Sequence, residues 1–231
     1  MKLCIIPARG GSKRLPRKNI KLFMGKPIIA YSIEAALASG CFDQVIVSTN
    51  DQEIADIATC YGAEVPFVRP EALCDDFTGT IPIINHAIEW FEQHEEKPEL
   101  VCCLYATAPF VTPEAIQQAY TLMLHEHADF CFTVTSFPSP IQRAVKLAAN
   151  GRLAMFHPEY FESRSQDLEE AYHDAGQFYW GKAEAFLQEK PLYSECSVPY
   201  ILPRYCVQDI DTLEDWQQAE ILFKLIKAEQ A

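Results

Sequence analysis

The sequence contains no apolar run long enough to cross a membrane. A membrane-spanning helix needs about 18 or more consecutive apolar residues, and no stretch of the 231 residues has that character. The opening MKLCIIPARGG combines one lysine with a short apolar run, which is too short for a secretory signal peptide. We therefore expect a cytoplasmic protein with no membrane partner.

The nine cysteines include no C-x-x-C pair, the spacing typical of zinc sites and redox motifs. Four of them, Cys4, Cys102, Cys103 and Cys131, lie in apolar runs that predict buried strands. Cysteine packs there as a small hydrophobic residue. We expect reduced structural thiols, as is usual in cytoplasmic proteins, and a zinc site or a thiol nucleophile has little support.

Acidic residues are absent from the first 33 positions, although Asp and Glu outnumber Lys and Arg by 32 to 19 over the whole chain. The same 33 positions contain eight Lys and Arg residues. Proteins that bind nucleic acid usually display a basic face, so the acidic total argues against nucleic acid as the main partner. A local basic block in an acidic chain indicates a small anionic ligand instead.

Both common glycine-rich nucleotide motifs are missing. Neither G-x-x-x-x-G-K-[ST] nor G-x-G-x-x-G fits the basic block, IPARGGSKRLPRKNI at 6–20, which disfavours a Rossmann oxidoreductase. The block follows an expected strand and precedes an expected helix, where open α/β sheets bind ligands. The groups that would hold a phosphate are the backbone of Gly10 and Gly11, the Ser12 hydroxyl, and the charges of Arg9, Lys13 and Lys18. The glycines would also let the backbone turn tightly. The alternative is a solvated basic loop.

Strand and helix signals alternate over most of the chain. Strands are expected at 2–6, 44–49, 64–68, 100–105, 129–136, 177–181, 198–202 and 205–210, and helices at 27–39, 51–62, 81–94, 113–125 and the C-terminal end. This rhythm predicts an α/β fold with a mostly parallel, doubly wound sheet, in one domain over 1–231. The rhythm breaks at about 137–175, which we interpret as an inserted β-arm for oligomer contacts. A long surface loop is the alternative.

A second candidate site is Asp209-Ile210-Asp211, at the end of the last expected strand. In an extended segment residues i and i+2 share a face, so both carboxylates can converge on one cation. Oxygen ligands beside a phosphate favour Mg²⁺. The alternative is that Asp211 caps the final helix, a role for which Thr212 competes. Paired with the phosphate loop, the carboxylates indicate metal-assisted attack on a nucleotide phosphate.

Five motifs resemble those of the CMP-sialic acid synthetases, the cytidylyltransferases of nine-carbon α-keto acid sugars. They are IPARGGSKRLPRKN, RPEALCDDFTGT (69–80), LYATAPF (104–110), DAGQFYW (174–180) and DIDTLEDW (209–216). The resemblance implies a Rossmann-like nucleotidyltransferase fold and a homodimer formed through the inserted arm. It also implies that CTP and the sugar react with Mg²⁺ as cofactor, giving the CMP-sugar and pyrophosphate.

The same resemblance implies roles for individual residues. The implied nucleotide contacts are the loop from Ala8 to Gly11, with Arg9, Ser12, Lys13, Lys18 and Asn19 on the triphosphate and Arg69 and Thr80 on cytosine. Asp209 and Asp211 would hold the metal, and catalysis would rest on Arg9, Lys13, Lys18 and Asp211. Arg14 and Arg17 fall outside the family's ligand positions and are expected to be solvated. On its own, Arg69 could instead form an ion pair.

One motif departs from the sialic acid enzymes. They carry Q-P-T-S-P-L-R where residues 105–111 read YATAPFV, so the sugar pocket should be less polar. The motif resembles instead that of pseudaminic acid cytidylyltransferases, whose sugar has acetamido groups and a deoxy terminus in place of several hydroxyls. The candidate sugar contacts are Tyr105, Thr107, His173, Asp174 and Gln177. Core packing is the alternative for the aromatic residues Tyr105, Phe110, Phe178 and Trp180.

Two other functions stay open at this point. The sugar could be another nonulosonate, such as legionaminic or N-acetylneuraminic acid, or the chain could be a nucleotide-binding module without turnover. The intact Asp209 and Asp211 pair argues against such a module. No residue stands out as a general base.

Overall fold

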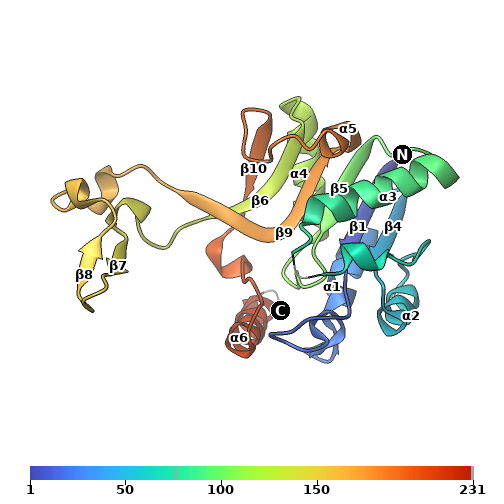
Figure 1. The fold of residues 1–231 in the computed structure, drawn as a ribbon, viewed down its shortest axis with the longest axis horizontal. Helices are drawn as coiled ribbons and strands as arrows, with labels where there is room; N and C mark the ends of the chain where they lie inside the picture. The colour runs from blue at the N-terminus through green and yellow to red at the C-terminus, as the bar shows by residue number, and fades with distance from the viewer. Residues whose placement is uncertain (76, 230–231) are drawn as a thin grey trace.

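The computed structural model describes residues 1–75 and 77–229 and centres on a six-stranded sheet (Figure 1). Its strands are β1 (Lys2–Pro7), β4 (Gln44–Ser48), β5 (Leu100–Leu104), β6 (Phe130–Ser136), β9 (Tyr172–Lys182) and β10 (Ser197–Ile201). They lie in the order β10-β6-β9-β5-β1-β4. β1 is parallel to β4 and β5, β10 is parallel to β6, and β9 runs antiparallel between β5 and β6. The mostly parallel α/β sheet is confirmed.

Helices cover both faces of this sheet. They are α1 (Ile28–Ser39), α2 (Gln52–Cys60), α3 (Thr80–His94), α4 (Pro113–His125), α5 (Ala183–Leu187) and α6 (Leu213–Glu229). α1, α2 and α4 bury apolar residues in one core cluster, and α3 and α5 bury theirs in a second. Among the described residues no helix has the length and apolar character needed to cross a bilayer.

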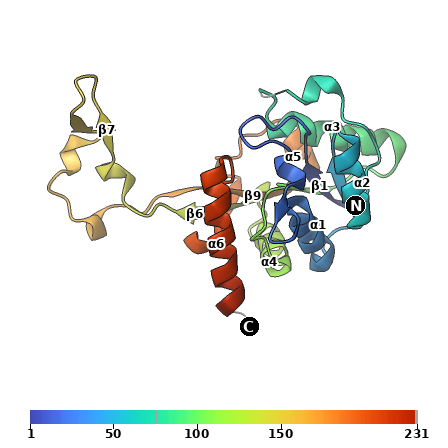
Figure 2. The same cartoon turned by 90° about the horizontal axis from the view of Figure 1, so that it is seen from below.

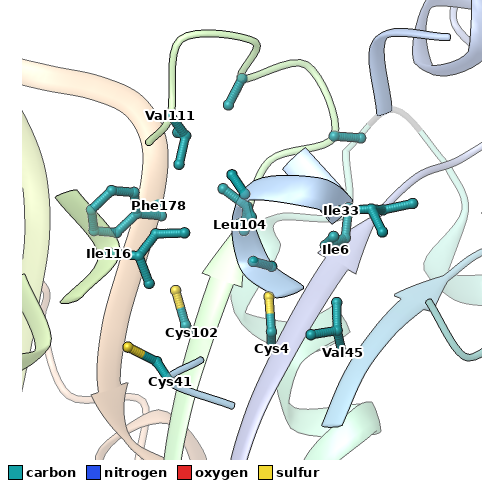
Figure 3. Packing of buried hydrophobic residues seen from close by; sticks show 14 of the residues in the cluster. Cys4, Ile6, Ile33, Cys41, Val45, Cys102, Leu104, Val111, Ile116 and Phe178 are labelled. Atoms are coloured by element: carbon teal, nitrogen blue, oxygen red, sulfur yellow. The ribbon is translucent and has the colours of Figure 1, made fainter. Parts of the chain in front are cut away.

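Alternate residues of the central strands enter opposite clusters. In β1, Cys4 and Ile6 pack on the face shown in Figure 3, and Leu3 and Ile5 pack on the other. Strands buried on both faces have continuous apolar sequences, because neither face meets water. The prediction for the four strand cysteines is confirmed: they are buried and free of disulfides, and burial raises the pKa of each thiol.

Polar side chains cap the first turns of α2 and α6. The Asp51 carboxylate accepts a hydrogen bond from the Ile54 N–H at 3.1 Å, as an N-cap of α2. At α6, Thr212 Oγ1 accepts from the Asp215 N–H at 3.2 Å and Asp215 Oδ2 accepts from the Thr212 N–H at 2.8 Å. Thr212 therefore caps the final helix, which leaves the Asp211 carboxylate available for other partners.

Two of the strands predicted from the sequence, 64–68 and 205–210, are not strands in the structure. Residues 64–68 make only isolated bridges, Ile46 to Glu64 and Thr49 to Val68, because Pro66 lacks an N–H to continue a ladder. Residues 205–210 leave the sheet in a 3₁₀ turn at Arg204–Cys206 and then run as a loop. Pro203 precedes that turn and fixes its entry. The Asp209–Asp211 segment is therefore a loop held by other contacts.

A third apolar cluster provides those contacts. The short strands β2 (Leu22–Phe23) and β3 (Lys26–Pro27) form a hairpin after the basic loop. Phe23 packs edge-on against Trp216 of α6 at a centroid distance of 5.4 Å. Leu15 of the basic loop and Ile210, between the two aspartates, are buried in the same cluster. This packing fixes the C-terminal aspartates beside the N-terminal loop.

The expected arm is a projection that leaves the sheet after Ser136 and returns at Tyr172. It carries a small hairpin, β7 (Val145–Leu147) and β8 (Leu153–Met155), and extends well away from the sheet in both views (Figures 1 and 2). The expected range ran to residue 175, but 172–175 belong to β9, whose first residues pair with β6.

Candidate functional site

A cavity of about 320 Å³ lies beyond the carboxyl ends of β1, β4 and β5. The expected site residues that line it are Arg9, Ser12, Lys18, Asn19, Arg69, Tyr105 and Thr107, and the other residues are Pro7, Leu73, Asp75, Thr78, Ile83 and Ala106. Ligands of open α/β sheets bind at this position. The structure therefore brings three of the five sequence motifs to one cavity.

The basic loop is held in shape by its own polar contacts. Asn19 Nδ2 donates to the Arg9 carbonyl at 2.9 Å, and Arg9 Nη1 donates to the Asp75 carbonyl at 2.5 Å. Arg17 has a left-handed backbone, with φ of 56°, and its guanidinium pairs with Asp51 and Glu53. The hydrogen bond from Arg17 lowers the pKa of Asp51. The expectation that Arg17 is solvated is therefore wrong, because the carboxylates of Asp51 and Glu53, at the start of α2, pair with its guanidinium.

Gly10 and Gly11 of the basic loop differ in whether a side chain would fit at their position. Neither has a positive φ, so neither position requires glycine for a left-handed backbone. A Cβ on Gly10 would lie 2.4 Å from Asp51 Oδ2, whereas a Cβ on Gly11 would have no neighbour within 4 Å. Arg17 draws Asp51 against the loop, and only a residue without a side chain fits at Gly10. Gly11 is exposed and leaves its backbone open to a ligand.

Two other residues expected on the nucleotide lie apart from the cavity wall. Ala8 is buried, and its N–H donates to the Ser48 carbonyl at 3.0 Å, so that donor is committed to β4. Lys13 is exposed on the outer part of the loop.

Arg69 is a buried cation at the wall of the cavity. Its side chain is 2% exposed, and it donates to the carbonyls of Ser48 and Leu73. Its buried Nε has no hydrogen-bond partner, and within residues 1–75 and 77–229 no carboxylate forms an ion pair with it. Burial lowers the pKa of Arg69. The ion-pair alternative is not supported, and the unpartnered donor favours a polar ligand in the cavity.

Thr80 and Tyr105 form a hydrogen-bonded pair beside this cavity. Their hydroxyl oxygens are 3.1 Å apart, and burial raises the pKa of Tyr105. Tyr105 lines the first cavity, but Thr80 lines a smaller cavity next to it. The threonine of this segment that lines the first cavity is Thr78, which sequence reasoning missed although it lies in the same 69–80 motif. Asp76 of that motif lies outside the described residues.

A second cavity, of about 510 Å³, contains the two candidate metal ligands. Asp209 and Asp211 line it together with His173, Asp174 and Arg14. Its other lining residues are Ala175, Val207, Gln208, Thr212 and Asp215. We call it the carboxylate cavity. A loop, and not a strand as predicted, therefore places the side chains of Asp209 and Asp211 in the same cavity.

Lys18 joins the two cavities. It lines the first, and its Nζ donates to the Ile210 carbonyl at 2.6 Å and to Asp211 Oδ1 at 3.2 Å. Arg14 is exposed, as expected, and it also forms an ion pair with Asp211 Oδ2 at 2.8 Å. The basic loop and the C-terminal aspartates are thus direct neighbours although they lie at opposite ends of the sequence.

The donor set fits a divalent cation that brings other ligands with it. Burial, and then the neighbouring Asp211, raise the pKa of Asp209, and its carboxylate has no hydrogen-bond partner among the described residues. A cation between the two would relieve that repulsion. No group of three or more His, Cys, Asp or Glu side chains in the described part of the chain could hold a metal alone. Mg²⁺ suits this set, because it retains waters and substrate oxygens beside one or two carboxylates.

The other expected sugar contacts, His173, Asp174 and Gln177, lie in different environments. His173 lies at the carboxylate cavity, with its Nδ1 2.8 Å from the Asp174 carbonyl. The Asp174 carboxylate accepts from the Tyr179 hydroxyl at 2.6 Å. Gln177 is 3% exposed and donates to the Cys206 carbonyl at 2.6 Å, which holds the 204–206 turn against β9. Phe178 is fully buried, which confirms core packing for it.

The chain matches known proteins over nearly its whole length. A family model described as Cytidylyltransferase matches residues 3–220. A pseudaminic acid cytidylyltransferase of Campylobacter jejuni is 48% identical over 96% of both chains. A CMP-N,N'-diacetyllegionaminic acid synthase of Legionella pneumophila is 36% identical over 96% of both chains.

The fold is also that of solved nucleotidyltransferases. The structure of a CMP:2-keto-3-deoxy-manno-octonic acid synthetase complexed with CTP superposes with a TM-score of 0.69, covering 97% of this chain and 98% of that one at 16% identity. The structural similarity supports the fold assignment, and the match to the family model shows that the chain belongs to that family. The chain belongs to the cytidylyltransferase family.

Proposed function

We propose that the protein is a pseudaminic acid cytidylyltransferase, which converts CTP and pseudaminate into CMP-pseudaminate and pyrophosphate. The main support is the 48% identity to the Campylobacter jejuni enzyme over 96% of both chains. Tyr105 supports it too, because it lines the first cavity at the position where the sialic acid enzymes carry a glutamine.

In this proposal the first cavity holds CTP. Arg9, Ser12 and Lys18 contact the triphosphate at the mouth of the loop, and Asn19 keeps the Arg9 carbonyl in place. Lys13 and the open backbone at Gly11 approach the phosphates from the outer side. Charge-assisted hydrogen bonds of this kind bind phosphate strongly. Arg69 lines this cavity and would contact the cytosine edge, with Thr80 acting beside it through Tyr105.

Asp209 and Asp211 would hold the Mg²⁺, which neutralises charge on the phosphates during transfer. Lys18 lies between the triphosphate and these carboxylates, so it can move from Asp211 to a phosphate oxygen when the cation replaces it. The anomeric hydroxyl of the sugar would approach the α-phosphate in line from the side of His173 and Asp174. The chain thereby aligns the nucleophile and the leaving group.

Release of pyrophosphate from CTP and Mg²⁺ tests the proposal across a panel of nonulosonic acids. We expect turnover with pseudaminate, and at least about tenfold lower kcat/KM with legionaminate and N-acetylneuraminate, since contacts to the sugar differ. A preference for N-acetylneuraminate would overturn the choice of sugar. No release with any acid would favour the nucleotide-binding module without turnover.

The carboxylate cavity generates a second prediction. Asp211→Asn should lower kcat by roughly 10²-fold or more, because the amide cannot share the cation's charge. CTP binding should change less. Asp167→Asn, an exposed carboxylate on the arm, is the matched control and should keep full activity. A near-normal kcat for Asp211→Asn would remove the metal role of this residue.

We also propose that two copies form a dimer through the arm. On the β7–β8 hairpin, Val145 faces Met155 and Leu147 faces Leu153 in register, so one face is apolar. Leu147 and Leu153 are each 73% exposed. An isolated two-stranded hairpin is marginally stable in water, and a second copy covering this face would stabilise it.

Light scattering tests the dimer. The chain should elute with twice its own mass, and the double variant Leu147→Glu with Leu153→Glu should elute as a monomer. Leu124→Glu, which places the same charge on α4 outside the arm, should stay dimeric. A monomeric unmodified chain at micromolar concentration would contradict the proposal.

A further inference from the structure

The carboxylate of Asp51 packs against the basic loop from outside the first cavity. Asp51 lies just beyond the end of β4, it does not line that cavity, and its side chain is 21% exposed. A Cβ on Gly10 would lie only 2.4 Å from its Oδ2, so the carboxylate touches the backbone of the loop. A negative charge beside a loop that binds phosphate weakens binding by repulsion unless it is neutralised. Its presence therefore needs a compensating role.

Arg17 neutralises this charge and joins the carboxylate to the loop. Its Nη1 donates to Asp51 Oδ2 at 2.5 Å, and its Nη2 donates to Asp51 Oδ1 at 3.0 Å. Two parallel bonds between a guanidinium and a carboxylate fix both side chains in orientation as well as in distance. The hydrogen bond from Arg17 also holds the pKa of the Asp51 carboxyl below its usual value. The carboxylate is thus an ionised anchor for Arg17.

The anchored residue has a backbone that it would rarely adopt alone. Arg17 has φ of 56° and ψ of 29°, in the left-handed region that is uncommon for residues other than glycine. It directly precedes the 3₁₀ turn Lys18–Ile20, and its carbonyl accepts the hydrogen bond that closes that turn at 3.1 Å. The turn carries Lys18 and Asn19, which both line the first cavity. The bond to Asp51 therefore holds the conformation that presents these two side chains.

The residues before Asp51 hold a different part of the site. The Ser48 carbonyl accepts from the Ala8 N–H at 3.0 Å and from the Arg69 guanidinium. The Thr49 carbonyl accepts from the Arg69 N–H at 2.8 Å, and Thr49 Oγ1 accepts from the Asp51 N–H at 3.1 Å. None of these bonds uses the Asp51 side chain. A change to that side chain can therefore loosen the basic loop while Arg69 keeps its place.

We propose that Asp51 is a positioning residue for the triphosphate, acting through Arg17 and through its contact with Gly10. It sets the shape of the basic loop before the nucleotide arrives, so less ordering is needed on binding. This inference rests on the proposed function, because it concerns the triphosphate of that reaction.

Calorimetric titration with CTP and with CMP, both with Mg²⁺ present, tests the role of Asp51. Asp51→Asn keeps the cap of α2, since asparagine caps helices as well as aspartate does. Its amide N–H, however, faces the donors of Arg17. The Kd for CTP should rise about tenfold, because the loop must then be ordered on binding. The Kd for CMP, which lacks the outer two phosphates, should stay nearly unchanged, as should the preference for CTP over UTP. Arg17→Gln should give the same pattern.

Two further variants separate this role from a general effect on the fold. Asp56→Asn removes the same charge from the same helix, where the carboxylate accepts from Gln52, and should bind CTP like the unmodified protein. Gly10→Ala should weaken CTP binding, and its effect should be smaller when it is combined with Asp51→Ser, because serine caps α2 but lacks the oxygen that a Cβ at residue 10 would meet.

Three results would overturn the inference. They are unchanged CTP binding in Asp51→Asn and Arg17→Gln, an equal loss of CTP and CMP binding, and strictly additive effects of Gly10→Ala and Asp51→Ser. Lack of turnover with pseudaminate would instead overturn the proposed function, since the titrations measure nucleotide binding without the sugar.

Discussion

The site depends on the burial of Ile210 and Leu15 in one apolar cluster with Phe23 and Trp216. Burying an isoleucine or a leucine stabilises a fold by about 1.5–3 kcal/mol each. The ion pair between Lys18 and Asp211 is partly exposed, and such pairs contribute about 0–1 kcal/mol. Apolar packing, rather than charge attraction, therefore brings the two ends of the chain together. The ion pairs form because the packing places these side chains together. Their charged groups can exchange one another for ligand atoms.

The site contains positive and negative groups that a ligand could pair with. Arg69 is buried with an unpartnered Nε, and Asp209 lies beside a second carboxylate in the carboxylate cavity. The buried donor of Arg69 is costly without a partner, and the two neighbouring carboxylates repel each other. A nucleoside triphosphate bound with a cation would supply both signs of charge at once.

Local patterns predicted the fold better than they predicted contacts between distant segments. The apolar runs at 2–6 and 100–105 are strands, since burial on both faces leaves a clear signal. The antiparallel direction of β9 leaves no such signal. Residues 205–210 are apolar enough for a strand, but Ile210 is buried against Trp216 instead of a neighbouring strand. The motifs placed Arg69, Lys18 and Asp211 at the site, yet the partners of Arg14 and Arg17 lie 34 or more residues away in sequence and could not be inferred.

The central claim is that the basic loop and the C-terminal aspartates bind one ligand, CTP with its cation. Calorimetric titration of CTP with and without Mg²⁺ tests it, on the unmodified protein and on Asp211→Asn. For the unmodified protein, Mg²⁺ should strengthen CTP binding by about tenfold or more, within the usual range of coupling between two sites. In Asp211→Asn that gain should disappear, while CTP binding without Mg²⁺ stays as tight or becomes tighter, because Lys18 and Arg14 are released. An equal gain from Mg²⁺ in both proteins would contradict the account.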